Sequence, residues 1–192
     1  MSAWLIAGLG NPGPRYESTR HNVGARVVER LGERLGERFR KARFIPARVA
    51  EAKADGQRLW LVRPLTFMNV SGPPVASFAR RHRLGPDRIV VCHDEIDLPF
   101  GALKLKRGGS TAGHHGLDSL CQALRSTDFF RVRLGVGRPR GRKEPADHVL
   151  DRFAKEERDE VELLIEDAAD AVLTLIREGM PAAQDRFNRS GR

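Results

Sequence analysis

Residues 3–13 read AWLIAGLGNPG, and this stretch decides the fold. The apolar run at residues 3–7 predicts a short buried strand that leads directly into a glycine-rich turn. Apolar residues then recur at helical spacing from Val23 to Phe39, which predicts a first helix that begins near Asn22. A buried strand, a tight turn and a helix in this order are typical of an α/β domain.

The rest of the chain continues to alternate predicted strands and helices. Residues 47–53 and 57–63 are predicted to pair as strands around an Asp-Gly turn. Two prolines lead into a second helix, for which Ser71 is a candidate cap. The remaining predicted elements are strands in RIVVCHD, ALKLKRG and FRVRLGVG and helices over residues 117–124 and 155–179.

We therefore predict a single domain over residues 1–192, an α/β sandwich in which helices flank a mixed, mainly parallel sheet. Its core is expected over residues 1–180, with a basic loop at 138–148 and a loose basic tail at 181–192. Within FRVRLGVG, alternation predicts that Arg131 and Arg133 face away from the core. Glycine and polar residues cluster just after the predicted strand ends, where open α/β sheets bind their ligands.

The net charge of +9 is unevenly distributed. Residues 155–170 hold eight acids and two bases, so the chain that precedes them is strongly basic. Such a surface attracts nucleic acid, although an arginine-rich composition alone would give the same charge. The N-terminus lacks a basic segment followed by a long apolar run, and no stretch is long enough to cross a bilayer, so we expect a cytoplasmic protein. The two cysteines predict neither a disulfide framework nor a metal site.

Gly8, Gly10 and Gly13 match the G-x-G-x-x-G pattern of dinucleotide-binding proteins. In those proteins the helix opens within the motif, so that its first amides face the pyrophosphate. Here two prolines interrupt the turn, and helical spacing starts only beyond the motif. We therefore expect no nucleotide cofactor and interpret the glycines as supports for a tight turn that lets Asn11 approach a ligand.

The polar residues after the strand ends favour an enzyme that activates water, because no G-x-S-x-G, H-E-x-x-H or C-x-x-C motif accompanies them. His21 with Asp94 would suit this task, since a carboxylate can fix the tautomer of an imidazole that accepts a proton at physiological pH. Asn11 and Asn69 could orient a substrate amide or stabilise an oxyanion. Each of these residues also has an ordinary structural interpretation in a turn, a cap or a backbone hydrogen bond.

A metal site built from His93, Asp94 and the adjacent His114 and His115 is a weaker alternative. The spacing of these residues matches no known ligand pattern, so we expect no metal.

Five blocks of sequence together resemble the bacterial peptidyl-tRNA hydrolase family in order and spacing: GLGNPGPRYESTRHNVG, RPLTFMNVSG, CHDEIDLPFGALKLKRGG, AGHHGLDSL and FRVRLGVGRP. The resemblance runs from residue 5 to about residue 139, and the acidic helix predicted near the C-terminus agrees with it. It implies a single α/β domain with a mixed sheet. It also implies an enzyme that cleaves the ester joining a peptide to the 3′ end of tRNA.

The resemblance assigns roles residue by residue. His21 matches the catalytic base, Asp94 the aspartate that supports it, and Asn11 and Asn69 the asparagines that hold the substrate and the attacking water. Met68 matches a methionine beside the peptide, although a core methionine would look the same in the sequence. The expected catalytic residues are thus His21, Asp94 and Asn11, and the expected substrate-binding residues are Asn69, Met68, His115, Tyr16 and Phe67.

One block departs from the family pattern G-H-N-G-L, because His115 stands where the family has asparagine. A neutral imidazole can also donate one hydrogen bond and accept another, but its ring is larger and can become charged. Lys106, Arg107 and Arg133 match the basic region that grips the tRNA acceptor stem in the family. Solvated charges on a strand are the alternative interpretation of these three.

We hypothesise that His21, oriented by Asp94, activates water to hydrolyse peptidyl-tRNA in a monomeric, cytoplasmic enzyme without a cofactor. Two alternatives stay open. His115 leaves room for a relative that binds RNA but has lost hydrolysis. An esterase or amidase for small molecules would differ by a weak salt dependence of kcat/KM, because tRNA binding through several phosphates gives a steep one.

Overall fold

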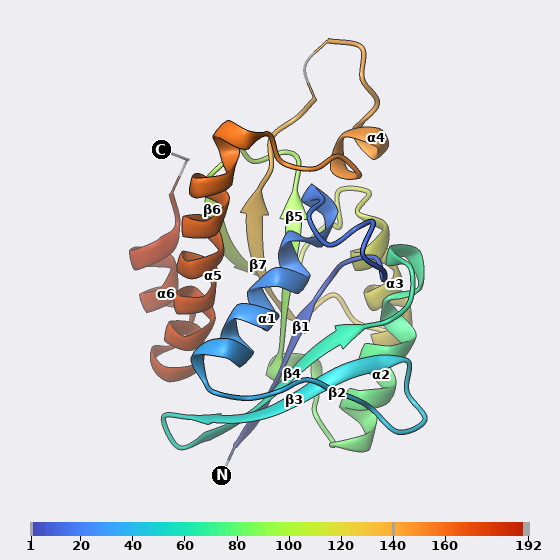
Figure 1. Cartoon of the computed structure of the whole chain (residues 1–192). Helices are drawn as coiled ribbons and strands as arrows, with labels where there is room; N and C mark the ends of the chain where they lie inside the picture. The colour runs from blue at the N-terminus through green and yellow to red at the C-terminus, as the bar shows by residue number, and fades with distance from the viewer. Residues whose placement is uncertain (1, 140, 190–192) are drawn as a thin grey trace.

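The computed structural model describes residues 2–139 and 141–189 and contains a seven-stranded mixed sheet (Figure 1). The strand order is β2-β3-β4-β1-β5-β7-β6. The four central strands β4, β1, β5 and β7 pair in parallel, and the outer pairs are antiparallel. The prediction of a mixed sheet is thereby confirmed, with three parallel strand pairs at the centre and three antiparallel pairs outside them. The strands are β1 (Ala3–Gly8), β2 (Arg40–Lys41), β3 (Ala47–Ala54), β4 (Gln57–Pro64), β5 (Ile89–Glu95), β6 (Leu103–Arg107) and β7 (Phe130–Gly135).

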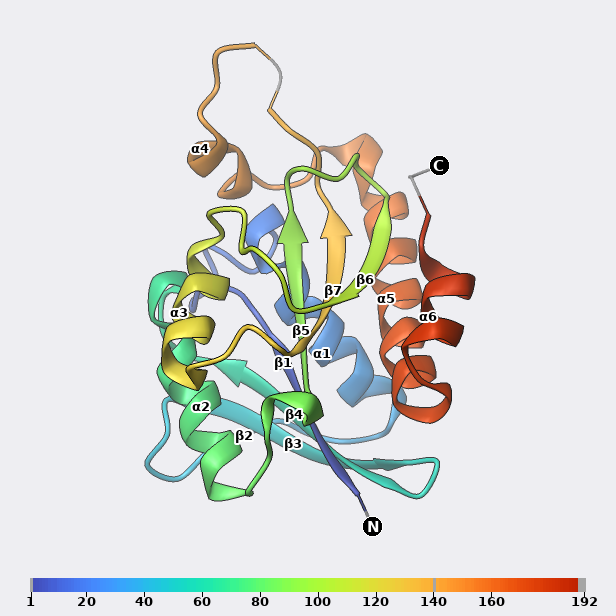
Figure 2. The same ribbon diagram turned by 180° about the vertical axis from the view of Figure 1, so that it is seen from behind.

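Helices cover both faces of the sheet, as expected for a sandwich (Figures 1 and 2). One face carries α1 (Val23–Arg34), α5 (Arg158–Glu178) and α6 (Met180–Phe187). The other carries α2 (Gly72–Arg81) and α3 (His115–Leu124). The shorter helices are η1 (Arg20–Asn22), η2 (Met68–Val70), η3 (Pro86–Arg88), α4 (Pro145–Val149) and η4 (Lys155–Glu157). Nowhere in the described chain does a helix combine the length and apolar character that a membrane span requires.

Close packing of α1 on β5 places the start of the first helix beside the end of a central strand. A Cβ atom on Gly24 would lie 2.1 Å from the carbonyl oxygen of Cys92, so only glycine allows this approach. The backbone amide of Leu9 also donates to the Cys92 carbonyl, at 3.1 Å. The turn after β1, the residues just before α1 and the carboxyl end of β5 therefore meet at one point of the sheet edge.

The prediction that Ser71 caps the second helix is wrong. Its side chain makes no capping hydrogen bond, because η2 runs almost directly into α2 and leaves Ser71 in helical conformation. The first amide of α2, on Gly72, donates instead to the Ser119 hydroxyl of α3 at 2.9 Å. A cap thus comes from a neighbouring helix, which the local sequence cannot reveal.

The segment expected as a basic loop contains α4, and the expected loose tail is wrong over residues 181–189. Helix α6 occupies most of that tail and packs on α5 and β6, with Ala183 fully buried. The backbone of Arg189 also pairs with Leu103 of β6, at 2.9 Å. The tail is ordered because it covers the edge strand β6, whose outer backbone groups need partners. Residues 190–192 lie outside the described part of the chain.

Alternation in β7 predicts that Arg131 faces away from the core, but this residue is not solvated, because only 1% of it is exposed. Pairing with β5 and β6 covers only the edges of β7. The Arg131 side chain is enclosed instead by the segment that contains Gly109 and Ser110 and by the Phe129 ring, whose centroid lies 4.9 Å from the guanidinium carbon. The Arg131 guanidinium donates to the carbonyl oxygens of Ser110 and Gly109, at 2.7 and 2.8 Å. It thereby holds the glycine-rich segment that leads into α3.

Candidate active site

A cavity of about 830 Å³ lies at the carboxyl ends of β1 and β5, where the sequence predicts the ligand site. Its wall includes all eight side chains predicted as catalytic or substrate-binding: Asn11, Tyr16, His21, Phe67, Met68, Asn69, Asp94 and His115. They come from five separate parts of the chain, namely the turn after β1, η1, the segment at η2, the end of β5 and the start of α3. The fold therefore brings together residues as far apart in the sequence as Asn11 and His115.

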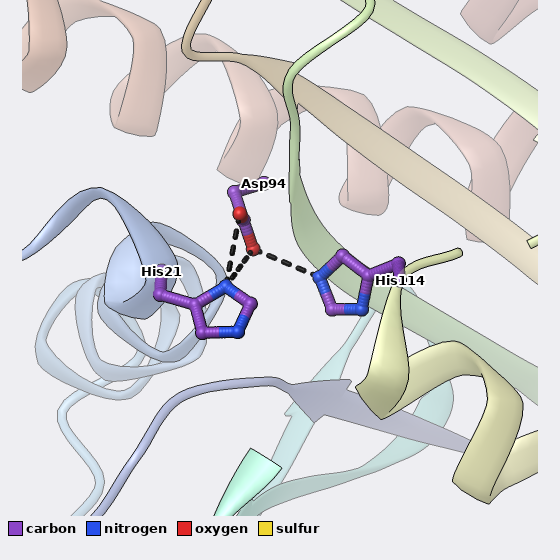
Figure 3. A group of neighbouring side chains, drawn as sticks. All are labelled: His21, Asp94 and His114. Atoms are coloured by element: carbon purple, nitrogen blue, oxygen red, sulfur yellow. Dashed lines mark hydrogen bonds and ion pairs between the residues drawn. The ribbon is translucent and has the colours of Figure 1, made fainter. Parts of the chain in front are cut away.

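His21 and Asp94 form a direct pair at this site (Figure 3). The Nδ1 atom of His21 lies 3.0 Å from each carboxylate oxygen of Asp94. Only 1% of the Asp94 side chain is exposed, against 12% for His21. A carboxylate acts only as an acceptor, so Nδ1 of His21 carries the proton of this bond. Its Nε2 atom has no partner among the described residues, and His21 lines the cavity.

The pair shifts the protonation of both members. Burial lowers the pKa of His21, but the Asp94 charge and hydrogen bond outweigh it, so that the pKa lies above the usual value. Burial by itself would raise the pKa of Asp94, yet the neighbouring His21 and His114 hold that pKa well below its ordinary range. Asp94 is therefore an anion at neutral pH, and His21 is a base strengthened by it.

Asn11 is fixed so that one end of its side-chain amide remains available. Its Oδ1 atom accepts a hydrogen bond from the Met68 backbone amide at 2.8 Å. Its backbone is held by the side chain of Asn22, which accepts from the Asn11 amide at 2.8 Å and donates to the Asn11 carbonyl at 2.9 Å. With Oδ1 occupied, the Nδ2 group of Asn11 is the donor left for a ligand in the cavity.

The other wall of the cavity is apolar and was not predicted. Ile96 and the α4 segment line it, the latter with Pro145, Ala146, Val149 and Leu150. Five helical residues after a basic loop are too few for a periodic pattern, so the sequence carries no signal for this wall. The cavity lining thus combines the polar groups around His21 with apolar surface from α4, Ile96, Met68 and Phe67.

His114 is the functional residue that sequence reasoning missed. We considered it as a polar candidate but assigned it no role beyond the weaker metal alternative. Its Nε2 atom lies 2.9 Å from Asp94 Oδ1, so Asp94 contacts two imidazoles at once (Figure 3). The His114–His115 pair is the only signal, and the sequence cannot say which of two adjacent rings turns inward.

His93, the remaining histidine near Asp94, belongs to the core. It is 1% exposed, and burial lowers its pKa to about 3, so it stays neutral. Its Nδ1 atom contacts the Asp94 carbonyl oxygen at 2.7 Å, and its ring packs edge-on against His114. His93 therefore contacts Asp94 and His114 from the core and does not line the cavity.

The three basic residues predicted to grip tRNA lie outside the cavity, on β6 and β7. Arg107 forms a bidentate ion pair with Asp128 on the exposed surface, with N–O distances of 2.7 and 2.8 Å. Arg133 contacts the Glu95 carboxylate, at 3.1 and 3.2 Å. Lys106 directly precedes Arg107 on β6, and no carboxylate of the described chain lies within ion-pair distance of it. Their predicted role in tRNA binding remains a prediction.

Comparison with known proteins agrees with this geometry. The family model described as peptidyl-tRNA hydrolase matches residues 5–192. The chain is 51% identical over 185 residues to a peptidyl-tRNA hydrolase of Frankia casuarinae, covering 96% of this chain and 93% of that protein. It is 50% identical over 184 residues to one of Nocardia farcinica, covering 96% and 95%. A crystal structure of peptidyl-tRNA hydrolase from Acinetobacter baumannii superposes with a TM-score of 0.92 at 32% identity, over 98% of this chain and 96% of that one.

Fold, site and similarity together define an ester hydrolase with an α/β fold. Within that class, the chain belongs to the peptidyl-tRNA hydrolase family.

Proposed function

We propose that this enzyme hydrolyses the ester bond between a peptide, or an N-blocked amino acid, and the 3′ ribose of tRNA, releasing free tRNA for reuse in translation. Family membership supports the reaction, and one observation supports the mechanism. His21 is held by a buried carboxylate through Nδ1, while its Nε2 atom has no hydrogen-bond partner among residues 2–139 and 141–189 and His21 lines the cavity.

In the proposed mechanism neutral His21 accepts a proton from water through Nε2 as the water oxygen attacks the ester carbonyl carbon. Asp94 stabilises the imidazolium that forms. The carbonyl oxygen gains negative charge, and the free Nδ2 group of Asn11, with Asn69, donates hydrogen bonds to the substrate there. The intermediate then breaks the bond to the ribose 3′ oxygen, which takes the proton back from His21. The products are a free carboxylic acid and tRNA with an intact 3′ hydroxyl.

The two walls of the cavity suit a substrate with one constant and one variable part. Met68, Phe67, Tyr16 and the α4 segment would contact the peptide through apolar surface, which does not select a particular side chain. His115, exposed at the cavity, can donate or accept one hydrogen bond in place of the family asparagine.

We further propose that Lys106, Arg107 and Arg133 bind tRNA phosphates. A phosphate would compete with Asp128 for Arg107 and with Glu95 for Arg133, whereas Lys106 forms no ion pair among the described residues. In this proposal the enzyme acts in the cytoplasm as a monomer, which light scattering of the purified protein would test.

A discharge assay tests the proposed function directly. Purified enzyme is expected to release the amino acid from N-acetyl-aminoacyl-tRNA and to leave free aminoacyl-tRNA intact over the same time. The alternative of an RNA binder without hydrolysis predicts no release from either substrate.

The salt dependence of kcat/KM distinguishes the proposed function from the alternative of a small-molecule esterase. Contacts with several phosphates make log kcat/KM fall steeply with log salt concentration, whereas a neutral ester gives a nearly flat line. A flat line for N-acetyl-aminoacyl-tRNA would contradict the proposed tRNA contacts.

A further inference from the structure

The two ring nitrogens of His114 contact two different parts of the molecule. Nδ1 accepts hydrogen bonds from the first amides of α3, those of Gly116 at 3.1 Å and Leu117 at 3.3 Å. Nε2 lies 2.9 Å from Oδ1 of Asp94. The His114 side chain is thus the N-cap of α3 and a contact of the catalytic carboxylate at the same time.

These contacts fix where the proton of His114 resides. Backbone amides act only as donors, so Nδ1 must present its lone pair to Gly116 and Leu117. A neutral imidazole has a single N–H, which is therefore on Nε2, the atom that faces Asp94. The start of α3 thus selects the tautomer that donates a hydrogen bond to the carboxylate.

Asp94 depends on this donor because it is enclosed. Its side chain is 1% exposed, and its hydrogen-bond donors among the described residues are the rings of His21 and His114. Oδ1 is shared by both rings and Oδ2 contacts His21 alone. The His114 bond therefore fixes the plane of the carboxylate and withdraws part of its charge from His21.

We propose that His114 is a positioning residue, which the N-terminus of α3 holds in one tautomer so that it orients Asp94 and moderates its pull on His21. This inference rests on the proposed function, in which His21 is the base. It adds that the glycine-rich segment held by Arg131 sets the strength of that base, because this segment leads directly into His114.

The same proton assignment argues against a metal at this place. Ligand atoms of His21, Asp94 and His114 lie within 4.8 Å of one another, which is close enough to surround one ion. A metal would need the lone pair of His114 Nε2, and the proton would then have to move to Nδ1, where it would oppose the two α3 amides. The donor set fits a hydrogen-bonded anion better than a metal ion.

Two substitutions separate the two contacts of His114. In His114→Asn the side-chain oxygen can occupy the place of Nδ1 and cap α3, but the donor to Asp94 is lost. In His114→Gln the longer amide can reach Asp94 as a donor, but the cap is lost. His82→Asn, on the far end of α2 and outside the cavity, serves as the matched control.

We expect His114→Asn to keep a Tm close to that of the parent while kcat falls about tenfold. Without the second donor Asp94 attracts the His21 proton more strongly, which raises the pKa of His21. The fall of kcat/KM on the acid side of its pH profile (the acid limb) therefore moves to higher pH. His114→Gln is expected to lower the Tm but to leave the acid-side fall of kcat/KM at the same pH as in the parent. His82→Asn is expected to leave that pH unchanged as well. The other titratable or charged groups that line the cavity or pack on His114 are the same in all these variants; they are Tyr16, His93, Glu95, His115 and Arg138.

An NMR titration of the His21 ring measures the same shift without turnover, so it separates this inference from the proposed function. A His21 pKa that is equal in the parent and in His114→Asn would overturn the inference, even with reduced activity. A shifted pKa in an enzyme that does not hydrolyse peptidyl-tRNA would support the inference and contradict the function.

Discussion

Two regions of this molecule are built from carboxylates held close to basic side chains, and they differ in almost every other respect. At the cavity, a single carboxylate, Asp94, lies between two imidazoles and is 1% exposed. On the surface, three arginines of α1 face three acids of α5, whose side chains are 41–47% exposed. The members of this ladder are Arg26, Arg30 and Arg34 on α1 and Glu162, Glu166 and Asp170 on α5.

The difference shows why ion pairing alone does not indicate function. Water and salt screen the ladder, and its members repeat every four residues, so losing one contact leaves others. No neighbouring carboxylate that the structure describes can replace Asp94 in its contacts with the two imidazoles. Asp94 is buried, so water does not screen its charge at short range, and its neighbours line a cavity. Perturbed protonation follows burial and a specific partner, which is why His21 and Asp94 are candidates for chemistry and the ladder is not.

The largest effect is expected from His21→Ala. Removing the base should lower kcat on N-acetyl-aminoacyl-tRNA by about 10²- to 10⁴-fold, the usual contribution of a general base. Affinity for uncharged tRNA, measured by filter binding, should change little because the phosphate contacts remain. Turnover within a few fold of the parent would remove His21 from the proposed mechanism.

Replacing an aspartate by asparagine in each region, at the cavity and in the surface ladder, tests the comparison most directly. Asp94→Asn should lower kcat at least about 10²-fold, because the amide cannot stabilise the imidazolium of His21. It should also move the acid limb of kcat/KM to lower pH, since the cause of the raised His21 pKa is gone. Asp170→Asn in the ladder should leave both quantities unchanged. Equal losses in the two variants would contradict the distinction drawn here.

A smaller effect is expected from pH in the parent enzyme. His21 works as a base only when neutral, and its pKa lies above the ordinary value of about 6.5. Accordingly kcat/KM should fall about tenfold per pH unit below that raised pKa and level off above it. Arg30→Ala, in the ladder, should give a superimposable profile. A level profile that continues below pH 6 would show that His21 is not the titrating base.

The smallest effect is expected from the ladder itself. Arg30 contacts Glu162 at 3.1 Å and also pairs with Glu166, so Arg30→Ala should lower the free energy of unfolding by about 0.5–1 kcal/mol at low salt. The loss should shrink in 1 M salt, where charges are screened over about 3 Å. Urea unfolding at both salt concentrations measures it. A loss that does not depend on salt would point to packing by the arginine stem instead of charge.

Local patterns predicted those parts of the fold that depend on neighbours in sequence. The alternation in residues 47–63 and the intervening Asp-Gly turn predicted the hairpin of β3 and β4. The apolar spacing after Asn22 predicted α1, and the acidic amphipathic stretch predicted α5. Errors came where a distant contact decided the outcome: Arg131 is buried because the segment with Gly109 and Ser110 lies over it, and α6 is ordered because it covers β6.

The sequence by itself predicted the class of chemistry, because its candidate polar residues offered an imidazole and a carboxylate as the means to activate water. It also determined the family, through blocks of residues in a fixed order. Only the tertiary structure decided that His114, rather than His115, turns to Asp94, and that α4 closes the cavity with apolar surface. The reason is physical: hydrogen bonds from the start of α3 and the packing of separate segments set the direction of each ring, and no local pattern of residues encodes them.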